Sequence, residues 1–571
     1  MRILLLTHAF NSLTQRLGAE LAQCGHEMSV EFDISDGVTQ EAVALFRPHL
    51  IVAPYLKRAI PESIWSRHVC LIVHPGIVGD RGPSALDWAI QQGETEWGVT
   101  VLQAIGDMDA GPVWSSANLT MRSAKKSSLY RNEVTQAATA AVLQAVQRFE
   151  SGDFVPKALA TWPDLRGRQR PMMKQGDRCV DWAREDTATV LRKIRAADGF
   201  PGLADRLFDA PCHLFDAWPE ATLRGESGTV IGRRQTALLR ATADGAVWIG
   251  HVKRPGSIKL PALMAFEQEA AAVPELPLQG WWRMATPTWQ DIAYEESAAL
   301  GLLHFEFYNG SMSTAQCERL RAALQWAKQR PTKVLLLMGG ADFWSNGIHL
   351  NVIEAASLAQ GSAADESWRN INAMNDLALE LIGTDRQITV AALSGNAGAG
   401  GCFLARACDL VWAREAVLLN PHYKNMGNLY GSEYWTYLLP RRVGADAARA
   451  IMRNRQPLTA RDALRIGLTD ACLTGAVPAF CSAVAQRATE LTADAPALAA
   501  RLAAKRETRA LDEATKPLAA YRAEELTQMR RNFYGFDPSY HIARHHFVHK
   551  SPASWTPRHL ARHRDLGWGP T

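Results

Sequence analysis

The first 150 residues alternate short apolar runs with stretches in which apolar residues recur every three or four positions. The apolar runs are RILLL, MSVEF, LIVAP and CLIVH, and the pattern between them predicts helices at 14–23 and 40–46. Strands that alternate with helices at this spacing are typical of a parallel sheet with crossover helices. Catalytic groups in such sheets lie beyond the carboxyl ends of the strands, and His74 stands at such an end, that of the fourth run.

The pattern changes further along the chain. Residues 153–177 are polar and rich in Pro, Gly and Arg, which indicates a linker. After a predicted helix at 187–197, short strand-like runs indicate a small β-rich module, and a second linker at 274–291 precedes a new α/β pattern. We expect an α/β multidomain protein with a parallel-sheet domain, a small β-rich domain, a second α/β domain and a helical C-terminal extension, at 1–160, 175–270, 292–510 and 511–571.

Composition restricts the class of protein. With 571 residues the chain is too long for one core, and its 47% hydrophobic and 21% charged residues are typical of a globular protein. A net charge of +4 with interspersed signs argues against a nucleic-acid partner. No apolar run approaches the roughly 20 residues of a membrane span. We therefore expect no membrane partner. The 9 cysteines form no CxxC pair, so we expect reduced thiols in the cytoplasm.

The fourth apolar run ends in His74 and enters a glycine- and proline-rich loop, HPGIVGDRGPS. Glycines let the backbone approach a ligand closely, and an imidazole can transfer a proton near neutral pH. The strand predicted at 98–104 leads into a turn that holds Asp107 and Asp109. This turn can bring a carboxylate beside His74, to fix its tautomer and stabilise its charged form. A buried structural pair is the alternative.

These two segments, HPGIVGDRGPSALDWAI and GVTVLQAIGDMDAGPVW, resemble the catalytic core of formyltransferases that use 10-formyltetrahydrofolate. The resemblance covers roughly residues 1–260, because DWAREDTATVLRKIRAADGFPG is similar to the start of the small C-terminal domain of those enzymes. It implies that the folate is a cofactor and that His74 and Asp109 are catalytic. It also implies that the loop residues Gly76, Arg81 and Gly82 bind the cofactor.

One position departs from the formyltransferase pattern. The family places an Asn two residues before the histidine, and this residue is Ile72 here. The resemblance implies that the Asn donates a hydrogen bond to the developing oxyanion, which isoleucine cannot do. Losing one such donor costs about 10²-fold or more in rate. Either another group, such as a backbone amide of PGIVGDRG, replaces it, or the chemistry is slow.

A second candidate site lies in SGNAGAGGCFLARACDLVWA, residues 394–413, where a predicted strand enters a glycine-rich turn and then an apolar helix. The start of such a helix presents amide donors and a positive dipole end, which suit an oxyanion or a phosphate. The segment lacks the Gly-Lys-Ser/Thr of a P-loop, so we do not expect nucleotide hydrolysis. Close packing of helix and strand through the glycines is the alternative.

Four segments together resemble the crotonase, or enoyl-CoA hydratase, family over about residues 297–480: GGADFWSNGIHLNVIE, LSGNAGAGGCFLARACDL, LLPRRVGADAARAIM and PLTARDALRIGLTDACL. This family holds an acyl-CoA thioester oxygen between two backbone amides. The resemblance implies that coenzyme A binds here and that the two amides are those of Ile348 and Gly400. It further implies that three neighbouring glycines belong to the binding site, namely Gly347, Gly398 and Gly401.

The crotonase resemblance also has departures. The two glutamates that activate water in a hydratase fall at Phe403 and His422, so hydration of an enoyl thioester is not expected. The segment NPHYKNMGNLYGSEYW instead offers His422, Tyr423 and Glu433 as candidate catalytic residues. A tyrosine and a glutamate can act as proton donor and acceptor at a small acyl group. Lining the cavity or capping a helix is the alternative role.

A chain that joins these two sites resembles the HypX (HoxX) class of [NiFe]-hydrogenase maturation proteins. The resemblance implies formyl transfer from 10-formyltetrahydrofolate to coenzyme A, then decarbonylation of formyl-CoA to carbon monoxide, a ligand of the hydrogenase iron. It also implies transient contact with other maturation proteins. Because a formyl thioester is reactive in water, we hypothesise that the two domains share an internal cavity.

Two other functions remain open at this stage. One is a formyl-tetrahydrofolate hydrolase or formyltransferase with a degenerate CoA domain. The other is a non-catalytic hydrogenase assembly factor, which Ile72 and the missing glutamates favour.

The C-terminal segment SYHIARHHFVHK carries His541, His545 and His549 at helical i, i+4, i+8 spacing. Three imidazoles on one helix face can bind zinc, but no cysteine or carboxylate cluster accompanies them in the sequence. We therefore predict no metal site and interpret the segment as a basic, aromatic helix that docks on its own protein.

Overall fold

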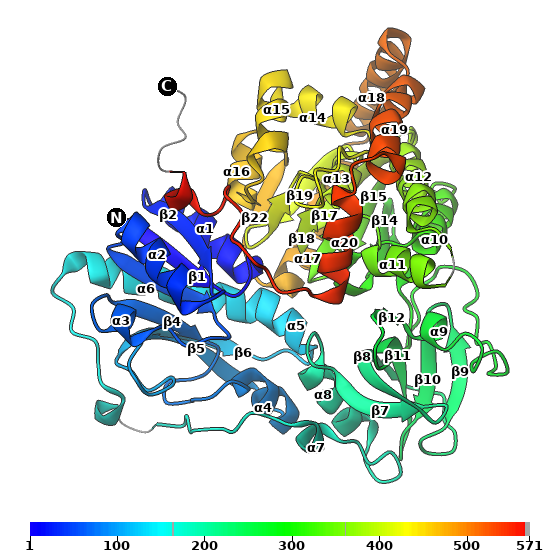
Figure 1. Cartoon of the computed structure of the whole chain (residues 1–571). Helices are drawn as coiled ribbons and strands as arrows, with labels where there is room; N and C mark the ends of the chain where they lie inside the picture. The colour runs from blue at the N-terminus through cyan, green and yellow to red at the C-terminus, as the bar shows by residue number, and fades with distance from the viewer. Residues whose placement is uncertain (163–164, 360, 566–571) are drawn as a thin grey trace. The chain divides into compact units, whose positions relative to one another are not determined.

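The computed structural model describes residues 1–162, 165–359 and 361–565, and the chain divides into two compact units (Figure 1). Unit 1 comprises Met1–Pro255, Pro261–Glu275 and Pro552–Thr571, and unit 2 comprises Gly256–Leu260 and Leu276–Ser551. The chain therefore leaves unit 1 after Glu275 and continues in unit 2 from Leu276, inside the linker expected at 274–291.

Unit 1 begins with a six-stranded sheet in which β1 to β4 are parallel. The strands follow the spatial order β2 (Glu27–Phe32), β1 (Arg2–Thr7), β3 (Leu50–Tyr55), β4 (Cys70–His74), β5 (Glu96–Gln103), β6 (Val113–Thr120). The central strands are apolar almost throughout because helices cover both faces. These helices are α1 (Ser12–Gln23), α2 (Asp36–Phe46), α3 (Glu62–Trp65), α4 (Ala85–Gln92), α5 (Lys126–Leu129) and α6 (Thr135–Ser151).

The last two strands of this sheet differ from the parallel arrangement that the pattern predicted. Strand β5 pairs antiparallel with β4 and with β6. The connection between β5 and β6 is a short turn, and a crossover to a parallel strand needs about a dozen residues or more. The turn that holds Asp109 therefore lies at the end of an antiparallel pair.

The small β-rich domain that the sequence predicted is confirmed as an antiparallel sheet. Its strands follow the order β7 (Leu203–Leu207), β8 (Ala210–Glu220), β11 (Ala246–Lys253), β10 (Ala237–Ala241), β9 (Val230–Arg234). Helix α8 (Thr187–Ala197) has the bounds that the sequence predicted, because Asp186 caps its start by accepting a hydrogen bond from the amide of Thr189.

Unit 2 contains the second α/β domain, built on a six-stranded and a four-stranded sheet. The larger sheet has the order β13 (Ile292–Ser297), β14 (Leu300–Phe305), β15 (Val334–Gly339), β17 (Ile388–Leu393), β19 (Leu410–Arg414), β22 (Ala471–Leu473). The smaller sheet has the order β16 (Phe343–Ser345), β18 (Asn396–Gly398), β20 (Leu418–Asn420), β21 (Leu458–Thr459).

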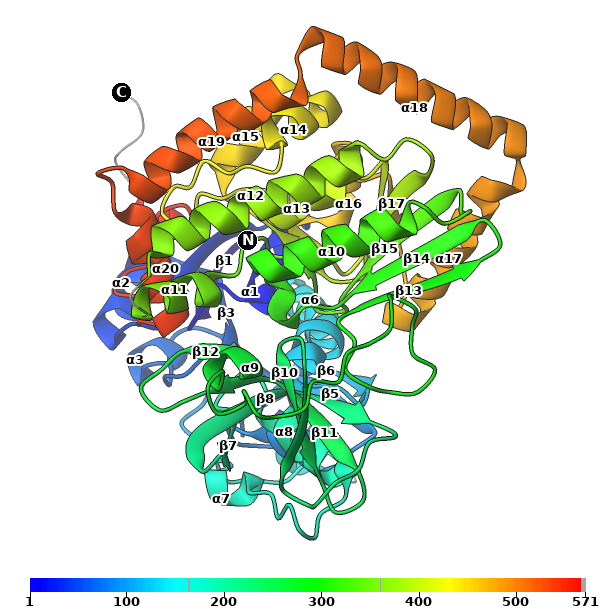
Figure 2. The ribbon, with the colours of Figure 1, turned by 90° about the vertical axis from the view of Figure 1, so that its right-hand side faces the viewer.

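Helices cover both faces of the larger sheet of unit 2. Figure 2 shows α12 running between α10 and α19 on one side. Helix α17 packs its buried residues Phe480, Val484 and Ala488 against the other face. The helices of this unit are α10 (Thr314–Ala327), α11 (Leu350–Leu358), α12 (Ala363–Ile382), α13 (Gly400–Arg406), α14 (Trp435–Val443), α15 (Ala445–Asn454), α16 (Ala460–Arg465), α17 (Val477–Ala493), α18 (Ala495–Thr515), α19 (Leu518–Tyr534) and α20 (Ser539–His549).

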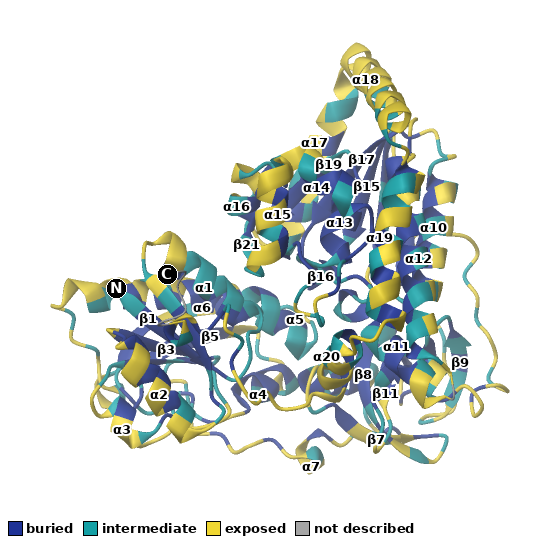
Figure 3. Cartoon of the chain, turned by 45° about the horizontal axis from the view of Figure 1, so that its top comes forward, coloured by how far each residue is buried: buried dark blue, intermediate teal, exposed yellow. Residues whose placement is uncertain are grey.

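The C-terminal helices begin before the expected boundary. The division expected between 510 and 511 falls inside α18, a largely exposed helix whose residue Leu498 is buried (Figure 3). Helices α19 and α20 return to the domain and bury apolar residues such as Met529 and Tyr540. Among the helices that the structure describes, none combines the length and the apolar character needed to cross a bilayer.

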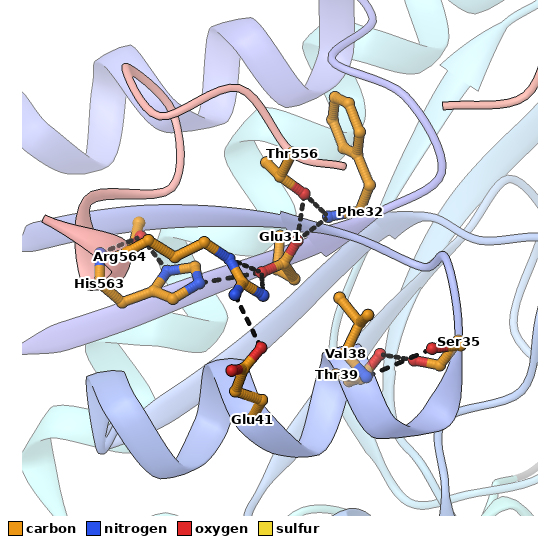
Figure 4. Close-up of polar contacts among 10 residues, drawn as sticks. Glu31, Phe32, Ser35, Val38, Thr39, Glu41, Thr556, His563 and Arg564 are labelled. Atoms are coloured by element: carbon orange, nitrogen blue, oxygen red, sulfur yellow. Dashed lines mark hydrogen bonds and ion pairs between the residues drawn. The ribbon is translucent and has the colours of Figure 1, made fainter. Parts of the chain in front are cut away.

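The segment after residue 551 belongs to unit 1, where it covers the edge strand β2 (Figure 4). The amide of Val30 donates to the carbonyl of Leu560, and the buried Glu31 carboxylate binds the side chains of Thr556, His563 and Arg564. Burial raises the pKa of Glu31, but these hydrogen bonds outweigh it and hold the pKa below its ordinary value. The segment therefore protects a strand edge that would otherwise be exposed.

Candidate active sites

In unit 1, His74 ends strand β4 opposite Thr100 of β5 and is 4% exposed. Its Nδ1 lies 3.4 Å from Oδ2 of Asp109, so the structure brings together the two residues expected to be catalytic. Its Nε2 lies 3.2 Å from Oδ1 of Asp80. The imidazole is thus fixed between two carboxylates, and each ring nitrogen has a place for a proton to be held or exchanged.

The sequence interpretation missed Asp80. Its carboxylate is buried, and Oδ2 accepts a hydrogen bond from Nε of Arg170 at 2.9 Å. Arg170 stands 90 positions later in the chain and is itself buried. The acid within GDRG was a local signal, but only the fold shows that it faces His74. This ion pair fixes Asp80, which in turn fixes one side of the imidazole.

Asp109 is held in a strained turn between β5 and β6. Its φ is +52°, in the left-handed region that few residues other than glycine adopt. Its Oδ2 accepts the amide hydrogen of Gly82 at 3.1 Å. A Cβ on Gly111 would lie 1.8 Å from the carbonyl oxygen of Gln103, so this turn requires glycine. Such strain persists only where the surroundings impose it, and it is common at functional sites.

The glycines of the loop after His74 have packing roles. A Cβ on Gly76 would lie 2.4 Å from Nε2 of His74, and one on Gly82 would lie 2.2 Å from the carbonyl oxygen of Arg170. The amide and carbonyl of Arg81 bond to residues 168 and 170, and its guanidinium lies 3.4 Å from Oε1 of Gln169. The loop expected to bind cofactor is therefore positioned against the imidazole, and its cofactor contacts stay a prediction.

Ile72 offers no side-chain donor at the position of the family's Asn. It is half-buried on β4, pairs with Leu102 and packs on the apolar face covered by α2. The amides of Asp80, Arg81 and Gly82 already donate to other groups. A backbone replacement for the missing donor is therefore restricted to the first part of the loop, residues 76–79.

In unit 2, the two amides expected to bind a thioester oxygen follow neighbouring parallel strands, β16 and β18. Gly347 has φ +77°, and a Cβ on it would lie 3.4 Å from the amide nitrogen of Gly400. Gly347 and Gly400 are therefore close together, and Ile348 follows Gly347 directly. Ala399, just before α13, has φ +49°, which is strained for a residue with a side chain.

The other glycines of this site pack strands closely. A Cβ on Gly401 would lie 2.0 Å from the carbonyl oxygen of Ser345, and one on Gly398 would lie 2.9 Å from Oδ1 of Asn346. Close helix-to-strand packing, one of the two sequence interpretations, thus holds for Gly401 of α13 against Ser345 of β16, whereas Gly398 of β18 packs on a side chain. It is compatible with a binding role, because the same packing sets the positions of the amides.

The structure brings Tyr423 and Glu433 together at the start of α13. The hydroxyl of Tyr423 donates to Oε2 of Glu433 at 2.6 Å, and Glu433 is 1% exposed. A Cβ on Gly400 would lie 2.3 Å from Oε1 of Glu433, so this carboxylate contacts the residue whose amide is an expected donor. Phe403, at the position of one hydratase glutamate, stacks on the ring of Tyr423 at 5.7 Å.

Burial governs the electrostatics of this pair. It raises the pKa of Glu433 to about 8, although the hydrogen bond from Tyr423 lowers it. Burial, together with the charge of Glu433, raises the pKa of Tyr423 well above its ordinary value. A carboxylate with this pKa is a stronger base than an ordinary glutamate, and the tyrosine keeps its proton until a partner becomes more basic.

Two further residues that the sequence interpretation missed hold Glu433 in place. Asn375 of α12 accepts hydrogen bonds through Oδ1 from the amide of Glu433 at 2.7 Å and from Oγ of Ser432 at 2.8 Å. Glu525 of α19 accepts from the amides of Tyr434 at 3.0 Å and Thr436 at 2.9 Å. Neither residue has a local signal, because each is more than fifty positions away from the turn.

The turn that these two residues hold is strained. Glu433 and Tyr434 have φ of +59° and +60°. Consecutive left-handed residues with large side chains need support, and Asn375 with Glu525 provides it. His422 is buried in the preceding loop, where its amide donates to the carbonyl of Asn420 at 2.8 Å. Its catalytic role stays a prediction.

Known families match three parts of the chain. The family Formyl transferase matches residues 31–146, and Formyl transferase, C-terminal domain, matches 172–268. Enoyl-CoA hydratase/isomerase matches 305–558. The fold and its two sites therefore define a protein that joins a formyltransferase-like region to a crotonase-like domain.

Relatives of full length identify the family. Hydrogenase maturation factor HoxX of Bradyrhizobium diazoefficiens is 55% identical over 566 residues, which cover 99% of this chain and 97% of the relative. The crystal structure of HypX from Aquifex aeolicus in complex with tetrahydrofolic acid is 46% identical, with a TM-score of 0.95 over 100% of both chains. The chain belongs to this HypX/HoxX family of hydrogenase maturation factors.

Some relatives match only part of the chain. Methionyl-tRNA formyltransferase of Aromatoleum aromaticum is 28% identical over 221 residues, which are 37% of this chain and 66% of the relative.

Proposed function

We propose that this chain synthesises the carbon monoxide ligand of the [NiFe]-hydrogenase active site. In this proposal it transfers a formyl group from 10-formyltetrahydrofolate to coenzyme A and then decarbonylates formyl-CoA. The observation that carries the proposal is the buried Tyr423–Glu433 pair in contact with Gly400, which suits proton transfer at a bound acyl group. The folate fits because a HypX relative was crystallised with tetrahydrofolic acid.

The first step takes place in unit 1. The thiol sulfur of coenzyme A attacks the formyl carbon, so that a C–S bond forms and the C–N bond to the folate breaks. His74 accepts the thiol proton and returns it to the folate nitrogen that leaves. Asp80 fixes the ring through Nε2. Asp109 lies at Nδ1, and its side chain is 12% exposed, whereas that of Asp80 is 0% exposed. The products are tetrahydrofolate and formyl-CoA.

The second step takes place in unit 2. The amides of Ile348 and Gly400 polarise the thioester carbonyl, and the Glu433 carboxylate removes the formyl hydrogen as a proton. The electrons of the C–H bond become the lone pair on the carbon of carbon monoxide. An oxygen lone pair forms its third bond as the C–S bond breaks. The thiolate takes a proton from Tyr423. Glu433 then returns its proton to Tyr423 through their 2.6 Å hydrogen bond, which restores the pair.

Localisation and partners follow from the same proposal. All 9 cysteines are free thiols, which suits the reducing conditions of a cytoplasm. Because the product is used in assembling a hydrogenase, the proposal includes transient contact with other maturation proteins.

The test is to incubate purified protein with 10-formyltetrahydrofolate, with and without coenzyme A, and to trap carbon monoxide on haemoglobin. The proposal expects carbon monoxide only when coenzyme A is present. Formate release that does not need coenzyme A would instead identify a formyl-tetrahydrofolate hydrolase. The absence of any turnover would identify a non-catalytic assembly factor.

A further inference from the structure

Helices α11 and α20 pack together in unit 2 and bring one carboxylate to two imidazoles. Oε1 of Glu354, on α11, lies 2.9 Å from Nδ1 of His545 and 3.1 Å from Nε2 of His549. The two histidines are one turn apart on α20, and their ring centroids are 4.1 Å apart. All three donor atoms lie within 4.8 Å of one another.

The carboxylate of Glu354 is already paired without the histidines. Its Oε2 accepts a hydrogen bond from Nε of the buried Arg544 at 2.7 Å, so its charge is neutralised from that side. Two protonated imidazoles beside this ion pair would place three cations around one carboxylate. A neutral imidazole avoids the repulsion between close like charges: its nitrogen beside Oε1 either donates a hydrogen bond there or, in the other tautomer, offers its lone pair to a metal ion.

The geometry points to a binding site for a divalent transition-metal ion, and we propose that Glu354, His545 and His549 are its three protein ligands. Imidazole nitrogen and carboxylate oxygen suit zinc and its neighbours in the first transition series. Tetrahedral coordination with bonds of about 2.0 Å places ligand atoms roughly 3.3 Å apart. The two imidazole nitrogens lie 2.9 and 3.1 Å from Oε1, close to this spacing.

Solvent and a supporting partner complete the site. The side chains of His545 and His549 are 55% and 32% exposed, whereas that of Glu354 is 5% exposed. The site therefore opens outward, so an ion can enter and a water can take the fourth position. Arg544 orients the carboxylate through Oε2 and leaves Oε1 for the metal, as supporting groups at metal sites do.

This site differs from the three-histidine face considered in the sequence. His541 lies on the same helix, but its Nε2 bonds to the carbonyl of Phe533 at 2.9 Å and its Nδ1 to Arg544. Only His545 and His549 of the three histidines face one common point. The carboxylate between them is that of Glu354 on α11, which stands 191 positions before His545. A bound ion would join the C-terminal helix α20 to α11.

The test uses tag-free, full-length protein freed of metal by a chelator. Zinc binding is measured by competition with a chromogenic chelator, and Co²⁺ is added separately to record the visible bands of tetrahedral cobalt. Wild type is compared with H545A/H549A and with the matched control His546→Ala, which removes an exposed histidine of the same helix. Circular dichroism establishes that each variant is folded.

We expect wild type and H546A to bind one more equivalent of zinc than the double variant. Any zinc that the double variant still binds at this position should be held at least tenfold more weakly. Only wild type and H546A should show the cobalt bands. Zinc should also raise the thermal midpoint of wild type and H546A but not that of the double variant. Equal zinc binding by wild type and H545A/H549A would overturn the proposal, as would an equal loss in H546A. Because these readouts do not involve turnover, they are independent of the proposed function.

Discussion

His74 and Glu433 serve different halves of the proposed reaction and lie in different units, so substitutions should separate the two steps. His74→Ala should lower tetrahydrofolate release by about 10²-fold or more, because the general acid–base group is lost. Glu433→Gln should leave this release near the wild-type rate and abolish carbon monoxide formation. The two products are measured by folate absorbance and by haemoglobin binding in the same sample.

The matched control for this pair is Glu507→Gln, which changes an exposed glutamate of α18 in the same way. It should leave both products unchanged. Carbon monoxide formation at the wild-type rate by Glu433→Gln would rule out the role proposed for that carboxylate.

The second reaction should also depend on pH in a defined direction. Burial raises the pKa of Glu433 to about 8, and only its carboxylate form can accept the formyl proton. Below that pKa, the ionised fraction and the rate should rise about tenfold per pH unit, and both should level off above it. Single-turnover formation of carbon monoxide from added formyl-CoA between pH 6 and 9 measures this. A rate that is constant or falls over this range would contradict the assignment.

At the level of residues, the sequence was sufficient to find candidate site residues that stand close together in the chain. His74 and its glycine loop are contiguous, and Tyr423 and Glu433 stand ten positions apart. The sequence did not identify Asp80, Asn375 and Glu525 as the residues that hold these site residues in place. An isolated Asn or Glu on a predicted helix has the same local pattern whether it faces solvent or a buried turn.

At the level of elements, the start of α13 depends on the absence of a side chain at Gly400. In Gly400→Ala, the new Cβ would lie 2.3 Å from Oε1 of Glu433, so the carboxylate must move. A displacement of about 1 Å at a reacting group costs about 10²-fold in rate. Carbon monoxide formation should fall by this factor, whereas tetrahydrofolate release from unit 1 should be unaffected. Gly37→Ala on α2, where a Cβ meets nothing within 4 Å, is the control.

Helix α19 contributes a second element-level prediction through Glu525, whose pKa burial raises to about 7. Between pH 4.5 and 7, Glu525 stays protonated in the folded state but is ionised in the unfolded state. Its contribution to stability is therefore full below about pH 4.5 and is lost as the pH rises through 7. Glutamine mimics the protonated form. The stability of wild type relative to Glu525→Gln should therefore fall by up to about 1.4 kcal/mol per pH unit in this window.

Urea unfolding of both proteins at pH 5.5 and pH 8.5 measures this difference. Above pH 7 the same variant should slow carbon monoxide formation, since the side-chain nitrogen of glutamine cannot accept the backbone hydrogen bonds that a Glu525 carboxylate oxygen accepts in the turn after Glu433. If wild type instead became more stable relative to Glu525→Gln as the pH rises, the change would have the wrong sign for a glutamate with a raised pKa.

Secondary structure was predictable where the local pattern was strong. Helix α8 matches its predicted bounds because its cap and its apolar face are both local. Helix α12 begins at Ala363, where Ser362 caps it, and its first turns bury the polar Ser367 and Asn370. Burial of polar residues by tertiary contacts leaves no local pattern. The strand predicted at 98–104 is present as β5, but its antiparallel pairing with β4 and β6 was not predicted, since strand direction depends on pairing.

At the level of the whole molecule, the C-terminal segment is part of the unit formed by the N-terminus. A chain that ends at residue 551 would remove Thr556, His563 and Arg564 from the Glu31 carboxylate and would expose the edge of β2. Breaking a buried pair by removing one partner costs about 3–5 kcal/mol. We expect lower stability of unit 1, faster amide exchange in β2 and more aggregation. A chain that ends at residue 565 keeps these contacts and should match wild type.

By itself, the sequence determined the fold families and the two candidate sites, because each family's motif is a contiguous segment whose glycines, strand ends and polar residues are visible together. The tertiary structure decided which groups support those sites. The contact of Asp80 with Arg170 joins residues 90 positions apart, and that of Glu354 with Arg544 joins residues 190 positions apart. Such pairs leave no pattern in a single chain, since only packing of distant elements creates the burial and charge pairing on which they depend.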